Sequence, residues 1–181
     1  HQIRVPVVGD APSDAILWDD LLGEKADLVT TQVEFDHPLW IVYSSGTTGN
    51  PKPIVSGHGG VLLEGAKQSL HMDLSTKDRY SWMTSSGWIM WNSQFTALGQ
   101  GSTVAMFDGA VNHPDLLELW RFVAREKLTF FGAGAAFYMT CMKAGLRPAD
   151  LLDLNALRSL GSTGSPLTSD GYEWVYSAVK P

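Results

Sequence analysis

The chain lacks most features that mark secreted, membrane-spanning or nucleic-acid-binding proteins. Its 181 residues include a single cysteine, Cys141, which excludes an internal disulfide and fits a cytoplasmic protein. No apolar run approaches the roughly 20 residues that cross a bilayer, so we expect no membrane partner. The formal net charge is -6, and the 13 lysines and arginines are scattered singly, so we expect no nucleic-acid partner.

The sequence also has few of the residue patterns that are typical of metal binding or of catalysis by paired carboxylates. The five histidines have no acidic or cysteine neighbour at metal-ligand spacing, so we predict no metal site. The carboxylates are dispersed, and Cys141 lies among residues typical of a buried helix, which favours a structural thiol. The chain begins at His1 without a signal-peptide pattern and ends just after an amphipathic stretch. We therefore expect both ends to lie within a longer protein.

The most informative segment is a loop rich in hydroxyl groups and glycine, which follows an apolar run at 39–43. Its glycines let the backbone approach a ligand, and exposed N–H groups in such a loop form a concavity that binds anions. Hydroxyl donors and a lysine add further donors and a positive charge. We predict that the loop holds the phosphates of a nucleotide through Ser44, Ser45, Gly46, Thr47, Thr48, Gly49 and Lys52.

This loop differs from the P-loop pattern G-x-x-x-x-G-K-[ST], which opens directly into a helix. Lys52 lies between two prolines, and Pro51 disfavours the helical conformation at Asn50. The apolar pair at 54–55 then indicates a short strand. The lysine is therefore predicted on a strand–loop–strand element, without a helix dipole behind the phosphate. The alternative is an ordinary surface loop rich in serine, threonine and glycine.

The rest of the chain alternates short apolar runs with helical periods. Strands are predicted at 39–43, 54–56, 79–83, 103–107, 128–131 and 159–160. Helices are predicted at 14–22, at 60–70, from Pro114 onward, at 135–144 and after a cap at Thr168 or Ser169. Strand spacings of roughly 20–30 residues are typical of βαβ units. We predict an α/β fold with a mainly parallel sheet packed with helices.

Three glycine-bearing turns, Gly87–Trp88, Phe131–Gly134 and Gly161–Gly164, are each predicted to follow a strand. Ligands of open α/β sheets bind beyond the carboxyl ends of the strands, so all three turns can face one crevice. Glycine there would leave room for a flat ligand against the backbone. Trp82 lies within a strand and is expected in the core.

The loop at 43–52 resembles the signature phosphate loop of the adenylate-forming superfamily. Members of that superfamily activate a carboxylate with ATP to an acyl-adenylate and pyrophosphate, and most then pass the acyl group to a thiol. Segments 82–92 and 157–167 are similar to the motifs that line the acyl pocket and pack against adenine. Within the superfamily, 37–40, 57–60 and 161–167 most resemble acetoacetyl-CoA synthetases.

The resemblance implies further site residues and cosubstrates. The implied acyl pocket contains Trp88, Met90 and Trp91. The implied adenine contact consists of Gly164, Ser165 and Pro166, with Ser165 where acetyl-CoA synthetases have a glutamate. The implied cofactors are ATP, Mg²⁺ and CoA, and the implied partner is a short-chain carboxylate, with acetoacetate as the favoured substrate.

We interpret residues 1–36 as a lead-in with a short helix, and 37–181 as part of the large N-terminal, AMP-binding domain. The superfamily's later motifs, including its catalytic lysine in a C-terminal domain, have no counterpart in this sequence. We therefore assign no catalytic residue and expect this polypeptide alone to be inactive. The alternatives are a fragment of another short-chain acyl-CoA synthetase or carrier-protein adenylating enzyme, and a non-catalytic module of the same fold.

Overall fold

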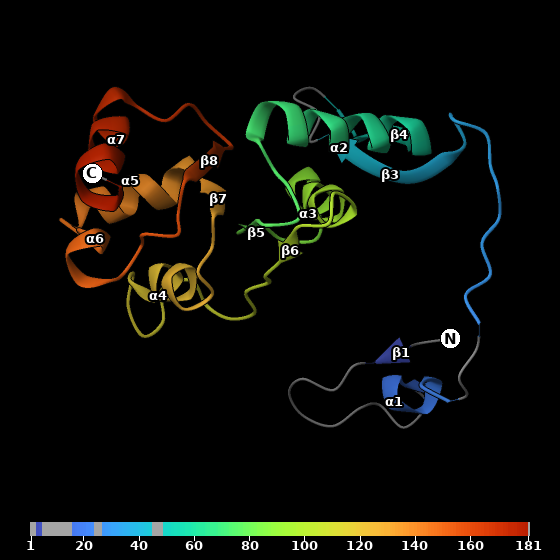
Figure 1. The fold of residues 1–181 in the computed structure, drawn as a ribbon, viewed down its shortest axis with the longest axis horizontal. Coiled ribbons are helices and arrows are strands. Elements are labelled where there is room, and N and C mark those ends of the chain that lie inside the picture. The colour runs from blue at the N-terminus through green and yellow to red at the C-terminus, as the bar shows by residue number, and fades with distance from the viewer. Residues whose placement is uncertain (1–2, 5–15, 24–26, 45–48, 181) are drawn as a thin grey trace. The chain divides into compact units, whose positions relative to one another are not determined.

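A computed structural model describes residues 3–4, 16–23, 27–44 and 49–180, and the chain forms two units (Figure 1). The first unit, His1–Val33, contains the parallel strands β1 (Ile3–Arg4) and β2 (Ile16–Leu17) and the helix α1 (Trp18–Leu21). Helix α1 is shorter than the helix predicted at 14–22. The second unit, Glu34–Pro181, contains every other described element.

The second unit begins with an antiparallel hairpin. Strand β3 (Pro38–Ser44) pairs with β4 (Lys52–Gly57), and Ser44 lies opposite Lys52 at the end of the pair. This confirms the strand–loop–strand element predicted around the lysine. Helix α2 (His58–Met72) begins directly after β4, so Lys52 stands at the start of a strand and not at the start of a helix.

The main sheet has four parallel strands in the order β6-β5-β7-β8, which confirms the predicted α/β fold. The strands are β5 (Arg79–Trp82), β6 (Thr103–Val104), β7 (Phe130–Gly134) and β8 (Ser159–Thr163). The connecting helices are α3 (Ile89–Gly99), α4 (Glu118–Arg125), α5 (Ala135–Lys143) and α6 (Pro148–Leu151). Helix α7 (Ser169–Trp174) and the π-helical turn η1 (Val175–Val179) follow β8.

Alternating side chains divide the core between the two faces of this sheet. On one face, Tyr80, Trp82 and Phe130 pack with Leu74, which follows α2, and Ala97 of α3. On the other face, strand residues pack with α4, α5 and α7 in a cluster that includes Phe131, Ala133, Trp120, Tyr138 and Trp174. The sheet is therefore the middle layer between two sets of helices.

Two expectations about local structure are wrong. Pro114 does not open a helix, because α4 begins at Glu118 and the Asp115 carboxylate instead accepts a hydrogen bond from the Leu117 N–H at 2.9 Å. The glycine segments at 131–134 and 161–163 lie within β7 and β8 and not in turns. Only Gly164, with φ of 87°, follows its strand in the left-handed conformation that favours glycine.

The amino ends of the strands meet at a buried carboxylate, Asp78. It accepts hydrogen bonds from the Thr129 hydroxyl at 2.7 Å, the Ser75 N–H at 2.8 Å and the Arg158 guanidinium at 3.1 Å. Arg158 also donates to the carbonyls of Met72 and Asp73, at 3.2 and 2.5 Å. Burial opposes ionisation of Asp78, but the hydrogen bonds outweigh it and lower the pKa of this carboxyl from its ordinary 3.8.

Substitution of Asp78 by Asn should remove an acid-sensitive part of the stability. A carboxyl whose pKa is lowered by folding stabilises the folded state above its unfolded pKa, and this contribution disappears as pH falls through the lower folded value. We expect Asp78→Asn to be less stable than the unsubstituted chain at neutral pH, with the difference shrinking below about pH 4. Urea unfolding across pH tests this, with the exposed Asp108→Asn as the control; a difference that does not depend on pH would contradict it.

Candidate functional site

A cavity of about 830 Å³ lies on the face of the sheet that packs with α2 and α3. The hairpin, both helices and the strands β5, β7 and β8 all contribute to its walls. Apolar side chains dominate these walls, and they include Trp40, Val61, Trp82, Met90, Phe130 and Leu160. Ligand sites are commonly of this size and character, with a few polar groups among apolar walls.

Beside this cavity, the indole of Trp82 lies across two neighbouring strands. Trp82 pairs in register with Gly132 of β7, which pairs in register with Gly161 of β8. A Cβ atom added at Gly132 would lie 2.2 Å from the indole, and one added at Gly161 would lie 2.5 Å from its far edge. The indole therefore occupies the space that these glycines were expected to leave for a flat ligand.

A polar cluster joins α2, α3 and β5 beside the same cavity. The amide Nε2 of the fully buried Gln68 donates to the carbonyl of Ser93 at 3.0 Å and to its hydroxyl at 3.1 Å. The Ser93 and Tyr80 hydroxyls are 2.9 Å apart, and Ser93 also lines the cavity. Burial raises the pKa of Tyr80 to about 12, despite the hydrogen bond with Ser93, so the phenol stays protonated at neutral pH.

Other polar groups lie at the walls of the cavity. Lys67 and Glu64, both on α2, line it and form an ion pair at 2.5 Å, so that cation already has an acidic partner. The Trp40 indole N–H is buried and finds no hydrogen-bond partner within the described part of the chain. Trp40 also lines the cavity, although its N–H is itself shielded from solvent.

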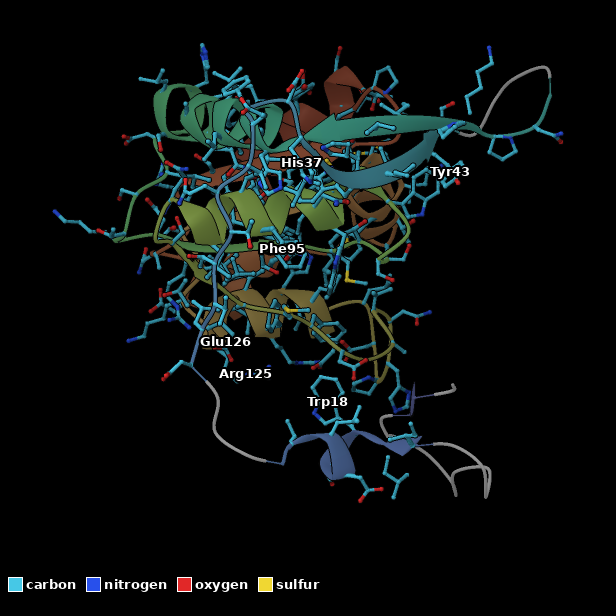
Figure 2. The ribbon with its side chains drawn as sticks, turned by 90° about the vertical axis from the view of Figure 1, so that its right-hand side faces the viewer. Trp18, His37, Tyr43, Phe95, Arg125 and Glu126 are labelled. Atoms are coloured by element: carbon cyan, nitrogen blue, oxygen red, sulfur yellow. The ribbon has the colours of Figure 1, made fainter. Side chains whose placement is uncertain are left out.

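The predicted phosphate loop lies at the end of the hairpin. Ser44 and Lys52 are the last paired residues of its two strands, and Lys52 and Gly49 are exposed. Ser45, Gly46, Thr47 and Thr48 lie outside the described residues. Figure 2 shows Tyr43 near one end of β3 and His37 near the other end, and Tyr43 is 65% exposed. The stem of the loop therefore points away from the sheet core.

Of the predicted acyl-pocket residues, Met90 lines the cavity. Trp88 precedes α3 and is 65% exposed, whereas Trp91 packs edge-on against Phe95 with ring centroids 6.2 Å apart. The predicted adenine contacts follow β8, and Gly164, Ser165 and Pro166 are all exposed. Their neighbours in β8, Gly161 and Ser162, reach the cavity wall.

The topology places the cavity at a favourable point of the sheet. The chain leaves β5 for β6 on one side and leaves β7 for β8 on the other, so the connections diverge between β5 and β7. Ligands of open α/β sheets bind outside the carboxyl ends of strands at such switch points. Trp82 closes β5 at this end, and the first turn of α3 carries Ile89 and Met90 into the cavity wall.

A family comparison agrees with this arrangement. The family model described as "AMP-binding enzyme" matches residues 3–181. The chain belongs to this family. The superfamily predicted from the loop at 43–52 is therefore confirmed.

Relatives in the AMP-binding family include acetoacetyl-CoA synthetases, which confirms the finer resemblance predicted from the motifs. The acetoacetyl-coenzyme A synthetase of Rhizobium meliloti (strain 1021) is 39% identical over 188 residues, covering 99% of this chain and 29% of that protein. The acetoacetyl-CoA synthetase of Gallus gallus is 38% identical over 178 residues, covering 96% of this chain and 27% of that protein. The chain thus spans less than a third of these relatives.

Solved structures give the same result for the fold. Acetoacetyl-CoA synthetase from Streptomyces lividans matches with a TM-score of 0.86 and 45% identity over 96% of this chain and 27% of its own. The anthranilate CoA ligase AuaEII, solved in complex with anthranoyl-AMP, matches with a TM-score of 0.80 over 94% of this chain and 33% of its own. Its 22% identity supports a shared fold alone.

Sequence reasoning missed the polar cluster of Gln68, Ser93 and Tyr80. The available signal was weak, because Gln68 shares a helical face with Val61 and Met72, where a polar residue is unusual. Within the described ranges, no three His, Cys, Asp or Glu residues gather where they could hold a metal. Nor do those ranges contain a helix with the length and apolar character to span a bilayer.

Substitution of Ser93 by Ala should destabilise the protein. The change leaves the Gln68 amide and the Tyr80 hydroxyl short of a buried partner, which costs about 1–3 kcal/mol. Denaturant unfolding measures this loss, with Ser86→Ala in the exposed turn before α3 as the matched control. Equal unfolding midpoints for the two variants would show that the cluster does not contribute to stability.

Proposed function

We propose that the complete protein containing this chain activates a short carboxylic acid with ATP and transfers the acyl group to CoA. Acetoacetate is the proposed acid, because the relatives named acetoacetyl-CoA synthetase align along nearly the whole chain. In this proposal the present chain supplies the phosphate loop and the walls of the acid and adenine sites. Activity belongs to the complete protein, and this chain alone is proposed to be inactive.

The observation that carries the proposal is the hairpin stem. A segment of hydroxyl residues and glycine connects two antiparallel strands whose last pair is Ser44 and Lys52. This pairing keeps the lysine beside the start of the loop, where a compact positive charge can reach a polyphosphate. Extended strands on both sides fix the ends of the loop, so its backbone N–H groups can converge on an anion.

The proposed chemistry has two transfers. A carboxylate oxygen of the acid attacks the α-phosphorus of ATP, the bond to the β-phosphate breaks, and pyrophosphate leaves. The CoA sulfur, after losing its proton, then attacks the acyl carbon, and AMP leaves. Both steps bring anionic groups together, so the chief task of the protein is to align the reactants and to offset their charge. Ser44 to Gly49 and Lys52 are proposed to do so at the β- and γ-phosphates.

The acid is proposed to lie in the cavity beside Met90, near the carboxyl ends of β5 and β7. Trp88 and Trp91 are proposed to border its entrance, and the adenine is proposed to lie along Gly164, Ser165 and Pro166. Mg²⁺ is proposed to accompany ATP. The described residues offer no cluster of metal ligands, so we assign the ion no side chain in this chain.

A substrate panel tests the proposed reaction. We expect the complete protein to release pyrophosphate and AMP when supplied with ATP, Mg²⁺, CoA and acetoacetate, and to do so faster than with acetate or with aromatic acids. Formation of the CoA thioester should equal AMP release. Absence of acid-dependent pyrophosphate release with every acid would overturn the proposal.

Removal of two loop hydroxyls should slow the first step. Each hydrogen bond to a charged phosphate contributes about 1.5–3 kcal/mol, so Thr47→Ala with Thr48→Ala should lower the rate of ATP–pyrophosphate exchange by about tenfold or more. The matched control is Thr30→Ala with Thr31→Ala, which changes an adjacent, exposed threonine pair far from the loop in sequence. An unchanged exchange rate in the 47/48 variant would remove these hydroxyls from the phosphate site.

A further inference from the structure

We propose that Trp82 is the residue that limits the depth of the acid-binding cavity, and that Gly132 and Gly161 position its indole. The inference rests on the proposed function, because it treats the cavity as the place where the acid binds. It concerns a residue outside the predicted acyl-pocket set of Trp88, Met90 and Trp91. In this proposal Trp82 selects short acids by excluding longer chains.

The indole of Trp82 packs against the main sheet. Trp82 is 8% exposed and lines the cavity, and its ring lies over the backbones of β7 and β8. Phe130, two register rows away on the same face, packs against it at 6.0 Å between centroids. The ring therefore separates the cavity from strand backbone that any smaller residue at position 82 would expose.

The two glycines have specific steric partners on this indole. At Gly132 an added Cβ would meet the ring-fusion atoms Cδ2 and Cε2 and the adjacent Cε3, with Cδ2 nearest at 2.2 Å. At Gly161 it would meet Cη2 and Cζ3, both at 2.5 Å, and Phe130 at 3.1 Å. Real Cβ atoms do not approach this closely, so a methyl group at either position forces the indole toward the cavity.

A further glycine, Gly134 of β7, shows that this steric constraint is local. The nearest heavy atom to a Cβ added at Gly134 is the Thr163 carbonyl oxygen, at 3.9 Å, which is an ordinary contact. Gly134 therefore tolerates a methyl group where Gly132 does not. Gly134→Ala therefore serves as the control for alanine at a glycine that the indole does not cover.

The first experiment changes the size of residue 82 in the complete protein. Rates of acid-dependent ATP–pyrophosphate exchange are measured for Trp82→Phe and Trp82→Leu with straight-chain acids that lengthen by one methylene at a time. We expect the preferred length to increase, with longer acids gaining roughly tenfold or more over the original substrate, the usual effect of one methylene in an apolar pocket. A purely structural tryptophan would lower the rates with all acids in proportion.

The second experiment tests the positioning of the ring. Gly161→Ala should reduce exchange with the preferred short acid, because the displaced indole narrows the cavity, whereas Gly134→Ala should not. Phenylalanine is shorter than tryptophan and lacks the Cη2 and Cζ3 atoms that meet Gly161. Trp82→Phe should therefore restore most of the activity lost in Gly161→Ala when the two changes are combined.

The outcomes separate this inference from the proposed function. If the unsubstituted protein activates acids but the folded Trp82 variants keep its length preference, the inference is wrong and the proposed function stands. If the unsubstituted protein activates no acid, the proposed function fails and the inference fails with it. Should Trp82→Leu not fold, Trp82→Phe and its combination with Gly161→Ala decide the matter, since independent effects of these two changes would overturn the inference.

Discussion

The parallel pairing of β5 with β7 is the constraint on which the candidate site depends. It sets Trp82 opposite Gly132, and the continuation of the same row sets Gly132 opposite Gly161. A ring as large as indole can lie flat on a sheet only where the neighbouring strands carry no Cβ beneath it. A shift of one residue in this register would bring Phe131 and Leu160 under the ring and turn the glycines to the other face.

The two ends of the same strands carry opposite chemistry. At the amino ends, Asp78 binds Thr129, Ser75 and Arg158 in a network that is almost fully satisfied by the protein itself. At the carboxyl ends, the walls of the cavity are mostly apolar. Satisfied polar networks make a protein region rigid, whereas an apolar cavity with a few polar groups suits a ligand. The hydrogen-bond network therefore stabilises the amino ends of the strands, and the cavity that could bind a ligand lies toward their carboxyl ends.

Much of the fold could be predicted from the sequence because local signals agreed with the tertiary structure. The strands at 39–43 and 79–83 and a cap at Thr168 or Ser169 were predicted, and the structure has both strands and the cap at Thr168. The helix start predicted at Pro114 was wrong because a proline in the first turn of a helix and a proline in the preceding loop look the same in a sequence. The turns predicted at the glycines of β7 and β8 were wrong because glycine is usually a turn residue. Glycine suits these strand positions because the Trp82 indole packs against them. Trp82 precedes Gly132 by about 50 residues and Gly161 by more, so no local pattern reveals the contact.

The candidate site was predictable only where residues close in sequence act together. The loop at 43–52 is such a unit, whereas the cavity joins residues from Trp40 to Ser162. The structure adds the physical connection between these two parts. Strand β4 runs into α2 without a loop, and α2 is held to α3 by Gln68 at Ser93 and by Ser69, whose hydroxyl donates to Gln100 at 3.0 Å.

This connection has a steric requirement of its own. A Cβ at Gly65 of α2 would lie 2.3 Å from the Gln100 amide, and one at Gly59 would lie 2.2 Å from the Phe35 ring. Glycine at these positions therefore lets α2 approach both the segment before β3 and the end of α3. Because α3 begins with the residues that line the cavity, the strand carrying Lys52 and the cavity wall are joined through one continuous packed path. If the proposed function is right, this packed path orients a nucleotide tail held at the hairpin relative to an acid in the cavity.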